Sequence, residues 1–167
     1  MPVRTLTFAT ALGRMRLGWT AEGICLLRFT DGLDRDEARE APAWVLGTMR
    51  RLMAHLAGQP QDLKDIPVDL SGLTPFQRRV AEVLRATRPG QTLRYGEVAL
   101  LAGRPGAARA VGQAVKANPV LILVPCHRVV ASKGPGGWSA FGSPAVKARL
   151  LALDRPHTGP DDAPPAR

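Results

Sequence analysis

The sequence contains only two cysteines, Cys25 and Cys126, among its 167 residues. Two thiols are too few for a disulfide framework, and their spacing fits no zinc cluster. No apolar stretch approaches the roughly 18 residues that a membrane-spanning helix needs. Charges scattered through the first 19 residues leave no apolar segment of the signal-peptide type. We therefore expect a protein of the reducing cytoplasm that has no membrane span and no metal cluster.

Acidic residues are scarce in the second half of the chain. Residues 1–71 hold 9 Lys and Arg against 9 Asp and Glu, whereas residues 72–155 hold 13 against 3, and the whole chain has a formal net charge of +9. A basic surface attracts polyanions because bound counterions are released. This excess of basic residues favours a nucleic-acid partner. The alternative explanations of the positive charge are a general solubilising role and a genome that prefers Arg to Lys. The composition, 45% hydrophobic and 22% charged, excludes a wholly disordered chain.

The first half of the chain predicts a small sheet with one helix. Residues 3–30 read as short antiparallel strands separated by turns near Gly13 and Gly23. Residues 42–56 place apolar side chains at helical spacing, and a polar connector follows over 59–73. We expect an α+β protein, with a sheet domain and its flanking helix over residues 1–72. A mostly helical domain over 73–155 follows, and residues 156–167, rich in proline, read as a disordered tail.

Three consecutive helices are predicted at the start of the second half. Thr74, Pro75 and Gln77 supply an N-cap, a first-turn proline and a capping box. Residues 96–102 and 107–117 predict two short helices around a Gly-containing turn, which is the outline of a helix-turn-helix and, more often, of a plain helical hairpin. The second of these helices is rich in Ala and Gly. That suits close packing on another helix, or close approach to a nucleic-acid backbone with Arg109 projecting from it.

A reactive cysteine is the clearest chemical signal. Residues 120–124 form a fully apolar run that predicts a buried strand or extended segment, and Pro125 must turn the chain immediately before Cys126 and His127. Thiolate is the reactive form of cysteine, and a neighbouring His in basic surroundings favours it. Adjacent side chains diverge, so we expect a water between the thiol and the imidazole. Cys25, among apolar residues, fits the commoner role of a buried hydrophobe.

A histidine that acts as a base usually needs a carboxylate to orient it. Among the three acids of the second half, Glu82 and Glu97 lie on predicted helix surfaces. Asp154 ends a predicted helix over residues 145–153 and follows Cys126 by 28 residues. Asp154 is therefore the candidate third member of the site.

Residues 74–154 resemble the O6-alkylguanine-DNA alkyltransferases. The family's Pro-Cys-His-Arg-Val signature is present at residues 125–129. Further matches surround it: TPFQRRV at 74–80, LRYGEVA at 93–99, and LAGRPGAARAVGQAVKANPVLILVPCHRVV at 101–130. Residues 1–71 resemble the family's N-terminal domain only in length and strand order.

The resemblance implies a single-use DNA repair protein. Such a protein binds double-stranded DNA through the minor groove, flips O6-alkylguanine out of the stack and transfers the alkyl group irreversibly to its own Cys126. It implies a monomer without a cofactor, and leaves open whether O4-alkylthymine is accepted.

The resemblance also assigns roles to individual residues. His127 and Asp154 would activate Cys126, and Asn118 would brace the active-site turn. Arg109 would take the place of the flipped base, and Tyr95 would rotate its phosphate and donate towards the guanine. The remaining matched positions are DNA contacts at Gln77, Gly96, Arg104 and Ser132, and a guanine pocket at Val129, Trp138 and Ser139.

Two positions depart from the family pattern. Asp154 stands where the family usually has Glu, and its shorter side chain loses roughly 1.5 Å of reach. Trp138 replaces a Tyr in a loop that walls the guanine pocket, and Ala140-Phe141 replaces a small pair. These departures favour an alternative, a protein that binds alkylated DNA without transferring the alkyl group, whereas the intact Cys126 argues against it. A DNA-binding regulator would explain the charge and leave Cys126 and His127 without a role.

Overall fold

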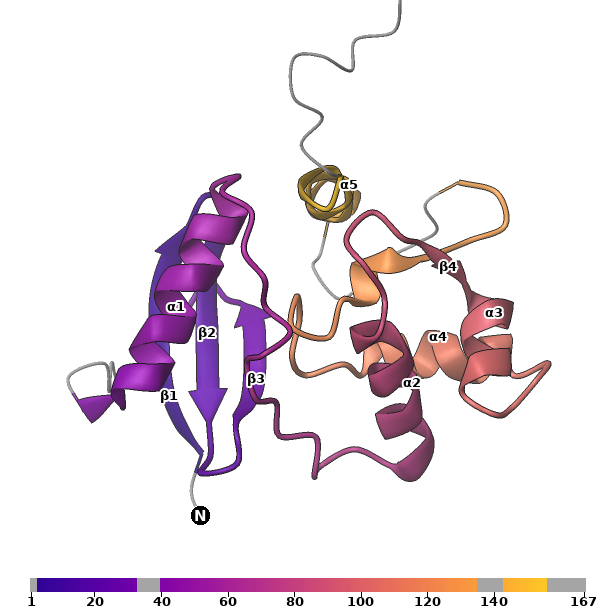
Figure 1. Cartoon of the computed structure of the whole chain (residues 1–167), viewed down its shortest axis with the longest axis horizontal. Coiled ribbons are helices and arrows are strands. Elements are labelled where there is room, and N and C mark those ends of the chain that lie inside the picture. The colour runs from indigo at the N-terminus through magenta and orange to yellow at the C-terminus, as the bar shows by residue number, and fades with distance from the viewer. Residues whose placement is uncertain (1–2, 33–39, 135–142, 156–167) are drawn as a thin grey trace, which may run out of the picture.

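The computed structural model describes residues 3–32, 40–134 and 143–155 (Figure 1). The chain opens with an antiparallel sheet in the order β1 (Arg4–Thr10), β2 (Gly13–Trp19) and β3 (Ile24–Phe29). Helix α1 (Ala43–Leu56) lies across one face of this sheet. The predicted meander and its flanking helix are confirmed. The predicted tail and the loop with Trp138 and Ser139 lie outside the described residues.

Alternation along the strands explains why one face of the sheet is covered. The register pairs Leu6 with Leu17 and Phe8 with Met15, and all four side chains are buried. Arg14 and Arg16 alternate with them on β2 and point to the other face, since successive side chains of a strand point to opposite sides. Helix α1 closes the buried face with a stripe at helical spacing: Val45, Thr48, Leu52 and Leu56.

The second part of the chain is mostly helical, as expected. It contains α2 (Pro75–Arg85), α3 (Tyr95–Leu101), α4 (Ala108–Lys116) and α5 (Pro144–Leu153). The Thr74 hydroxyl accepts from the Gln77 amide, and the Gln77 side chain accepts from the Thr74 amide, so the predicted capping box is confirmed. Helices α3 and α4 follow one another around the turn over 102–107, and the α+β fold class is confirmed.

A two-residue parallel pairing that the sequence analysis missed connects this part to the reactive segment. Strand β4 (Leu93–Arg94) pairs with β5 (Val129–Val130), with Leu93 opposite Val129. Strand β4 runs directly into α3, and β5 directly follows Cys126–Arg128. This short ladder therefore fixes Tyr95, the first residue of α3, relative to the cysteine segment.

The apolar run over 120–124 is buried as predicted, but the predicted strand or extended segment is wrong. The chain turns back on itself there: the Val124 amide donates to the Val120 carbonyl, and Ile122 has φ +72. A β-branched residue rarely adopts this left-handed conformation. The Asn118 side chain holds it, because its Oδ1 accepts from the Val120 amide and its Nδ2 donates to the Val124 carbonyl, both at 3.0 Å.

The N-terminal sheet anchors this turn from outside. The Leu27 amide of β3 donates to the Pro119 carbonyl, and the Leu121 amide donates to the Leu27 carbonyl, both at 2.9 Å. The connector before α2 docks on the same strand, because the Ile24 amide donates to the Pro67 carbonyl and the Asp69 amide to the Ile24 carbonyl. Strand β3 thus holds both the entry to the helical part and the turn that precedes Cys126.

Gly23 at this joint predicts a measurable loss of stability on substitution. Its φ is +154, and a Cβ there would lie 2.7 Å from the Pro67 carbonyl carbon and oxygen. We expect Gly23→Ala to lower the free energy of unfolding by about 1–3 kcal/mol. Gly47→Ala in α1 is the matched control, since a Cβ there meets nothing within 4 Å. It should raise stability by about 0.5–1 kcal/mol. Urea denaturation measures both, and equal effects of the two substitutions would contradict the account.

Candidate active site

Cys126 lies at the start of a single 3₁₀ turn, η2 (Cys126–Arg128), directly after the Asn118-braced turn. Its side chain is fully buried. The Cys126 amide donates to the Val124 carbonyl at 2.7 Å, and the Arg128 amide donates to the Pro125 carbonyl at 3.0 Å. Backbone hydrogen bonds therefore fix the position of the cysteine segment. Within this turn, His127 and Arg128 both direct their side chains to a residue 26–27 positions further along the chain.

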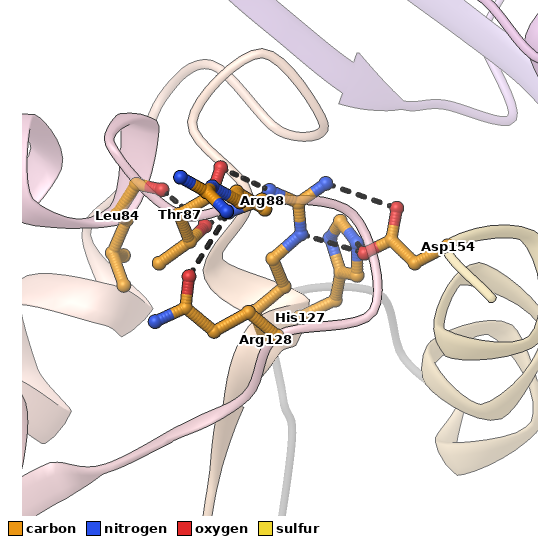
Figure 2. A network of polar contacts seen from close by, with 7 residues as sticks. Leu84, Thr87, Arg88, His127, Arg128 and Asp154 are labelled. Carbon is orange, nitrogen blue, oxygen red and sulfur yellow. Dashed lines mark hydrogen bonds and ion pairs between the residues drawn. The ribbon is translucent and has the colours of Figure 1, made fainter. Parts of the chain in front are cut away.

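That residue is Asp154, and its carboxylate is the centre of a buried polar network (Figure 2). Oδ2 of Asp154 lies 2.8 Å from Nε2 of His127 and 2.6 Å from Nε of Arg128, and Oδ1 accepts from Nη2 of Arg128 at 3.0 Å. The other guanidinium nitrogen, Nη1, donates to the carbonyl and the hydroxyl of Thr87. The Thr87 hydroxyl in turn donates to the Leu84 carbonyl. The network thus links three separate segments of the chain.

The shorter side chain of Asp154 does not prevent this contact. Asp154 is the C-cap residue of α5, and its amide donates to the Leu150 carbonyl in the last turn of the helix. The C-terminal end of α5 therefore places the Asp154 carboxylate within hydrogen-bond distance of His127. The sequence-based concern that one missing methylene breaks the hydrogen bond is wrong for this chain, because the 2.8 Å distance is that of a normal hydrogen bond.

Burial and pairing set the protonation states of this network. Burial alone raises the pKa of Asp154, but hydrogen bonds from His127 and Arg128 outweigh it and hold that pKa far below its usual value. Burial lowers the pKa of His127, and the hydrogen bond with Asp154 opposes this only in part. At neutral pH the site therefore combines an ionised carboxylate with a neutral imidazole.

These states determine the tautomer of His127. An ionised carboxylate can only accept, so Nε2 of His127 must carry the proton of the hydrogen bond. In a neutral imidazole the other nitrogen is then a bare acceptor. This atom, Nδ1, is buried and has no hydrogen-bond partner among the described residues. His127 thus presents an acceptor that can take a proton through a bridging water.

Lys147 is a member of the site that the sequence analysis missed. It lies on α5, is only 1% exposed, and its Nζ donates to the Val129 carbonyl at 2.7 Å. Burial lowers the pKa of Lys147, and the charge of the Cys126 thiolate opposes this effect. An ammonium group therefore lies within electrostatic range of the sulfur. Its position one residue after Val146 and three before Leu150, on the apolar side of the predicted helix, was the available signal.

A hollow of about 610 Å³ is lined by the end of β4, by the first residues of α3 and α4, and by the segment that follows β5. Tyr95 and Gly96 open α3, Ala108 opens α4, and Ser132 follows β5. Burial, and secondarily the charge of Cys126, raises the pKa of Tyr95, so its hydroxyl stays protonated. The structure therefore brings Tyr95, Gly96 and Ser132 together at one opening near the cysteine. Val129 is buried in β5, behind this rim.

The other predicted DNA contacts lie on the exposed side of the helical part. Arg109 is exposed in the first turn of α4, and Arg104 is exposed on the turn before it. The Ala- and Gly-rich helix serves packing on its inner side, since a Cβ on Gly112 would lie 3.9 Å from the Tyr95 ring. The side-chain oxygen of Gln77 is engaged in the capping box. These residues therefore do not join the Asp154 network.

Neither a membrane-spanning helix nor a group of three metal-ligating side chains occurs in the part of the chain that the structure describes. The chemistry available in the described site is that of a thiol, an imidazole, a carboxylate and an ammonium group.

The Asp154 network predicts how stability depends on pH. Asp154 has a lower pKa in the folded protein than in the unfolded chain, so below about pH 4 the unfolded chain binds a proton that the folded protein does not. Its contribution is therefore present above pH 4 and is lost as the pH falls. Asp154→Asn should lower the free energy of unfolding at pH 7 by about 3–5 kcal/mol, since it leaves the buried Arg128 without a counter-ion.

The control for this measurement is Asp65→Asn, which breaks the exposed ion pair with Arg51. Urea denaturation between pH 3 and pH 7 should show a shallower pH dependence for Asp154→Asn than for the wild type, and little change at pH 7 for Asp65→Asn. Equal losses at pH 7 for the two variants would show that the buried network contributes no more than a surface pair.

Comparison with known proteins identifies this arrangement. Residues 75–156 match the family described as 6-O-methylguanine DNA methyltransferase, DNA binding domain. A methylated-DNA–protein-cysteine methyltransferase of Mycolicibacterium paratuberculosis is 44% identical over 120 residues, which cover 71% of this chain and 70% of the relative. The human protein of the same name is 36% identical over 165 residues, covering 90% of this chain and 79% of the relative.

Solved structures agree with the sequence comparisons. The O6-methylguanine methyltransferase of Mycobacterium tuberculosis superimposes with a TM-score of 0.78 at 32% identity, covering 99% of this chain and 97% of the other. A structure of Mycobacterium tuberculosis OGT in complex with DNA gives a TM-score of 0.74 at 33% identity, covering 90% and 91%. The resemblance noted in the sequence is thus confirmed over most of the chain. The chain belongs to the methylated-DNA–protein-cysteine methyltransferase family.

Proposed function

We propose that this protein repairs double-stranded DNA by transferring the alkyl group of O6-alkylguanine to Sγ of its own Cys126. The observation that carries this assignment is the state of His127: Nε2 donates to an ionised Asp154, and Nδ1 is a buried acceptor next to the reactive cysteine. Family membership supplies the class of reaction, single-use alkyl transfer from DNA to cysteine. Because Cys126 must stay reduced, the cytoplasm is the compartment that suits it.

The first step is ionisation of the thiol. Nδ1 of His127 accepts the Cys126 proton through one bridging water, and the Asp154 carboxylate stabilises the imidazolium that forms. The positive charge of the Lys147 ammonium group stabilises the thiolate. Arg128 keeps Asp154 ionised, so the carboxylate attracts the new positive charge without taking the proton.

The second step is a direct displacement. The Cys126 thiolate attacks the alkyl carbon, so a carbon–sulfur bond forms as the carbon–oxygen bond to O6 breaks, and that electron pair stays on the guanine. The Tyr95 hydroxyl, kept protonated at neutral pH, is the donor that compensates the negative charge of the leaving base. The leaving base takes up one proton, which the Tyr95 hydroxyl supplies and solvent returns to Tyr95, so guanine is restored. The alkyl group stays on Sγ of Cys126, so each molecule reacts once.

The geometry of duplex DNA requires the lesion to leave the stack before this reaction. We assign the hollow bounded by Tyr95, Gly96, Ala108 and Ser132 as the entry for the flipped nucleotide, because Tyr95 at its rim is close enough to Cys126 for the charge of the sulfur to raise the Tyr95 pKa. Arg109, exposed at the start of α4, is the side chain that fills the vacated place in the duplex. We propose that one monomer acts on one lesion.

The alternative is binding of alkylated DNA without transfer. It drew its support from Asp154 and from the Trp138 loop. The 2.8 Å hydrogen bond between Asp154 and His127 removes the first reason. Trp138 lies outside the described residues, so the second reason still stands. The experiment below distinguishes this alternative from alkyl transfer.

The decisive experiment measures the intact mass of the protein after it reacts with a duplex that contains one O6-methylguanine. We expect one CH₂ group to be added per molecule. Cys126→Ser should add nothing, whereas Cys25→Ser, which changes the other thiol, should react as the wild type does. Tight binding of the lesion duplex without a mass gain would establish the alternative. A gain that persists in Cys126→Ser would move the reaction to another residue.

A further inference from the structure

An aromatic ring holds one of the basic side chains of the helical part. The guanidinium carbon of Arg104 lies 4.9 Å from the centre of the Phe76 ring, within the range of a cation–π contact. Arg104 is on the turn between α3 and α4, and Phe76 is in the first turn of α2. The contact therefore joins two elements that are 28 positions apart in the sequence.

Both partners of this contact stand on rigid backbone. Phe76 lies between Pro75 and Gln77, where the capping box fixes the first turn of α2, and its ring packs against the hydrophobic core. The Arg104 amide donates to the Ala99 carbonyl at 2.9 Å, and the Arg104 carbonyl accepts from the Ala107 amide at 3.1 Å. The Arg104 side chain is thus restrained at both ends: hydrogen bonds fix its backbone, and the Phe76 ring holds its guanidinium.

Packing of the hydrophobic core does not require the Arg104 side chain to be held in place. Its side chain is exposed, and an exposed arginine normally keeps most of its rotamer freedom in solution. The Phe76 ring restrains this freedom before a ligand is bound. Pre-ordering a side chain reduces the entropy that binding must otherwise remove, so it raises affinity for a partner that contacts this side chain.

The position of Arg104 identifies the chemistry of that partner. The turn that carries it leads directly into α4, whose first residues include the exposed Arg109 and Ala108 at the edge of the hollow. In a helix-turn-helix the start of the second helix is the part that meets DNA. Residues 72–155 hold 13 basic and 3 acidic residues, so the partner at this turn is an anion. A planar guanidinium suits a backbone phosphate.

We propose that Phe76 is a positioning residue for DNA binding: its ring holds the Arg104 guanidinium in the orientation in which it contacts a backbone phosphate beside the lesion. Phe76 itself does not touch the DNA. This inference rests on the proposed function only for the partner, duplex DNA, and is independent of the alkyl-transfer step.

The test is a double-mutant cycle on an unmodified duplex, with dissociation constants measured over a range of salt concentrations. Arg104→Ala should weaken binding and reduce the slope of log K against log salt by about one. Phe76→Leu should weaken binding by roughly two- to tenfold, because binding must then order the freed Arg104 side chain. In the Arg104→Ala background, Phe76→Leu should cause no further loss. Phe76→Tyr, which keeps an aromatic face, should restore the wild-type affinity.

Arg104→Lys separates orientation from charge, because lysine keeps the positive charge and lacks the planar group that lies against the ring. It should lower affinity while leaving the salt slope near that of the wild type. If Phe76→Leu weakens binding equally with and without Arg104, or if Phe76→Tyr fails to restore it, the proposal is wrong and Phe76 has only a packing role.

Mass measurement on the same preparations, with the O6-methylguanine duplex, keeps this result distinct from the proposed function. A wild-type protein that binds DNA and gains no mass contradicts alkyl transfer and leaves the double-mutant cycle intact. Wild-type mass gain without coupling between Phe76 and Arg104 contradicts only the positioning role.

Discussion

The ionised carboxylate of Asp154 is the group on which the rest of the site depends. A buried charge is costly unless it is paired and hydrogen-bonded, and here both oxygens are occupied by His127 and Arg128. Arg128 neutralises the charge of the carboxylate, so Asp154 stays ionised while His127 stays neutral. Burial keeps His127 neutral, and the hydrogen bond to Asp154 places its proton on Nε2, so Nδ1 is unprotonated. Thr87 then becomes part of the active site, since its carbonyl and hydroxyl oxygens hold the far side of the Arg128 guanidinium.

The fold supplies this geometry by holding a strained turn between two supports. Ile122 adopts a left-handed conformation, and the Asn118 side chain bridges the turn from within. Strand β3 supports it from outside through Leu27. The N-terminal sheet therefore contributes to the chemistry although it supplies no reacting group: it fixes the segment that ends in Cys126. The same segment continues into β5, whose pairing with β4 places Tyr95 at the opening beside the cysteine.

Local signals predicted much of this structure, and the failures have a common cause. The capping box at Thr74, the helix that ends at Asp154 and the three-strand meander each depend on neighbouring residues, so periodicity and cap chemistry were sufficient. The turn over 120–124 was predicted as a strand or extended segment because an apolar run does not show that Asn118 and Leu27 bend it. The β4–β5 pairing and the burial of Lys147 also depend on contacts between distant segments. Similarly, bond lengths alone underestimated Asp154, because they do not show how close the end of α5 lies to His127.

The protonation of His127 tests the account most directly. Long-range proton–nitrogen NMR of the uniformly ¹⁵N-labelled protein distinguishes the two imidazole nitrogens, and His127→Gln identifies the signals. At pH 7 we expect a neutral ring with the proton on Nε2 and a bare Nδ1 in the wild type, and we expect Asp154→Asn to lose this preference. A charged imidazolium in the wild type would show that burial does not keep the ring neutral, and a proton on Nδ1 would show that Asp154 does not set the tautomer. Either result would contradict the proposed route for activating Cys126.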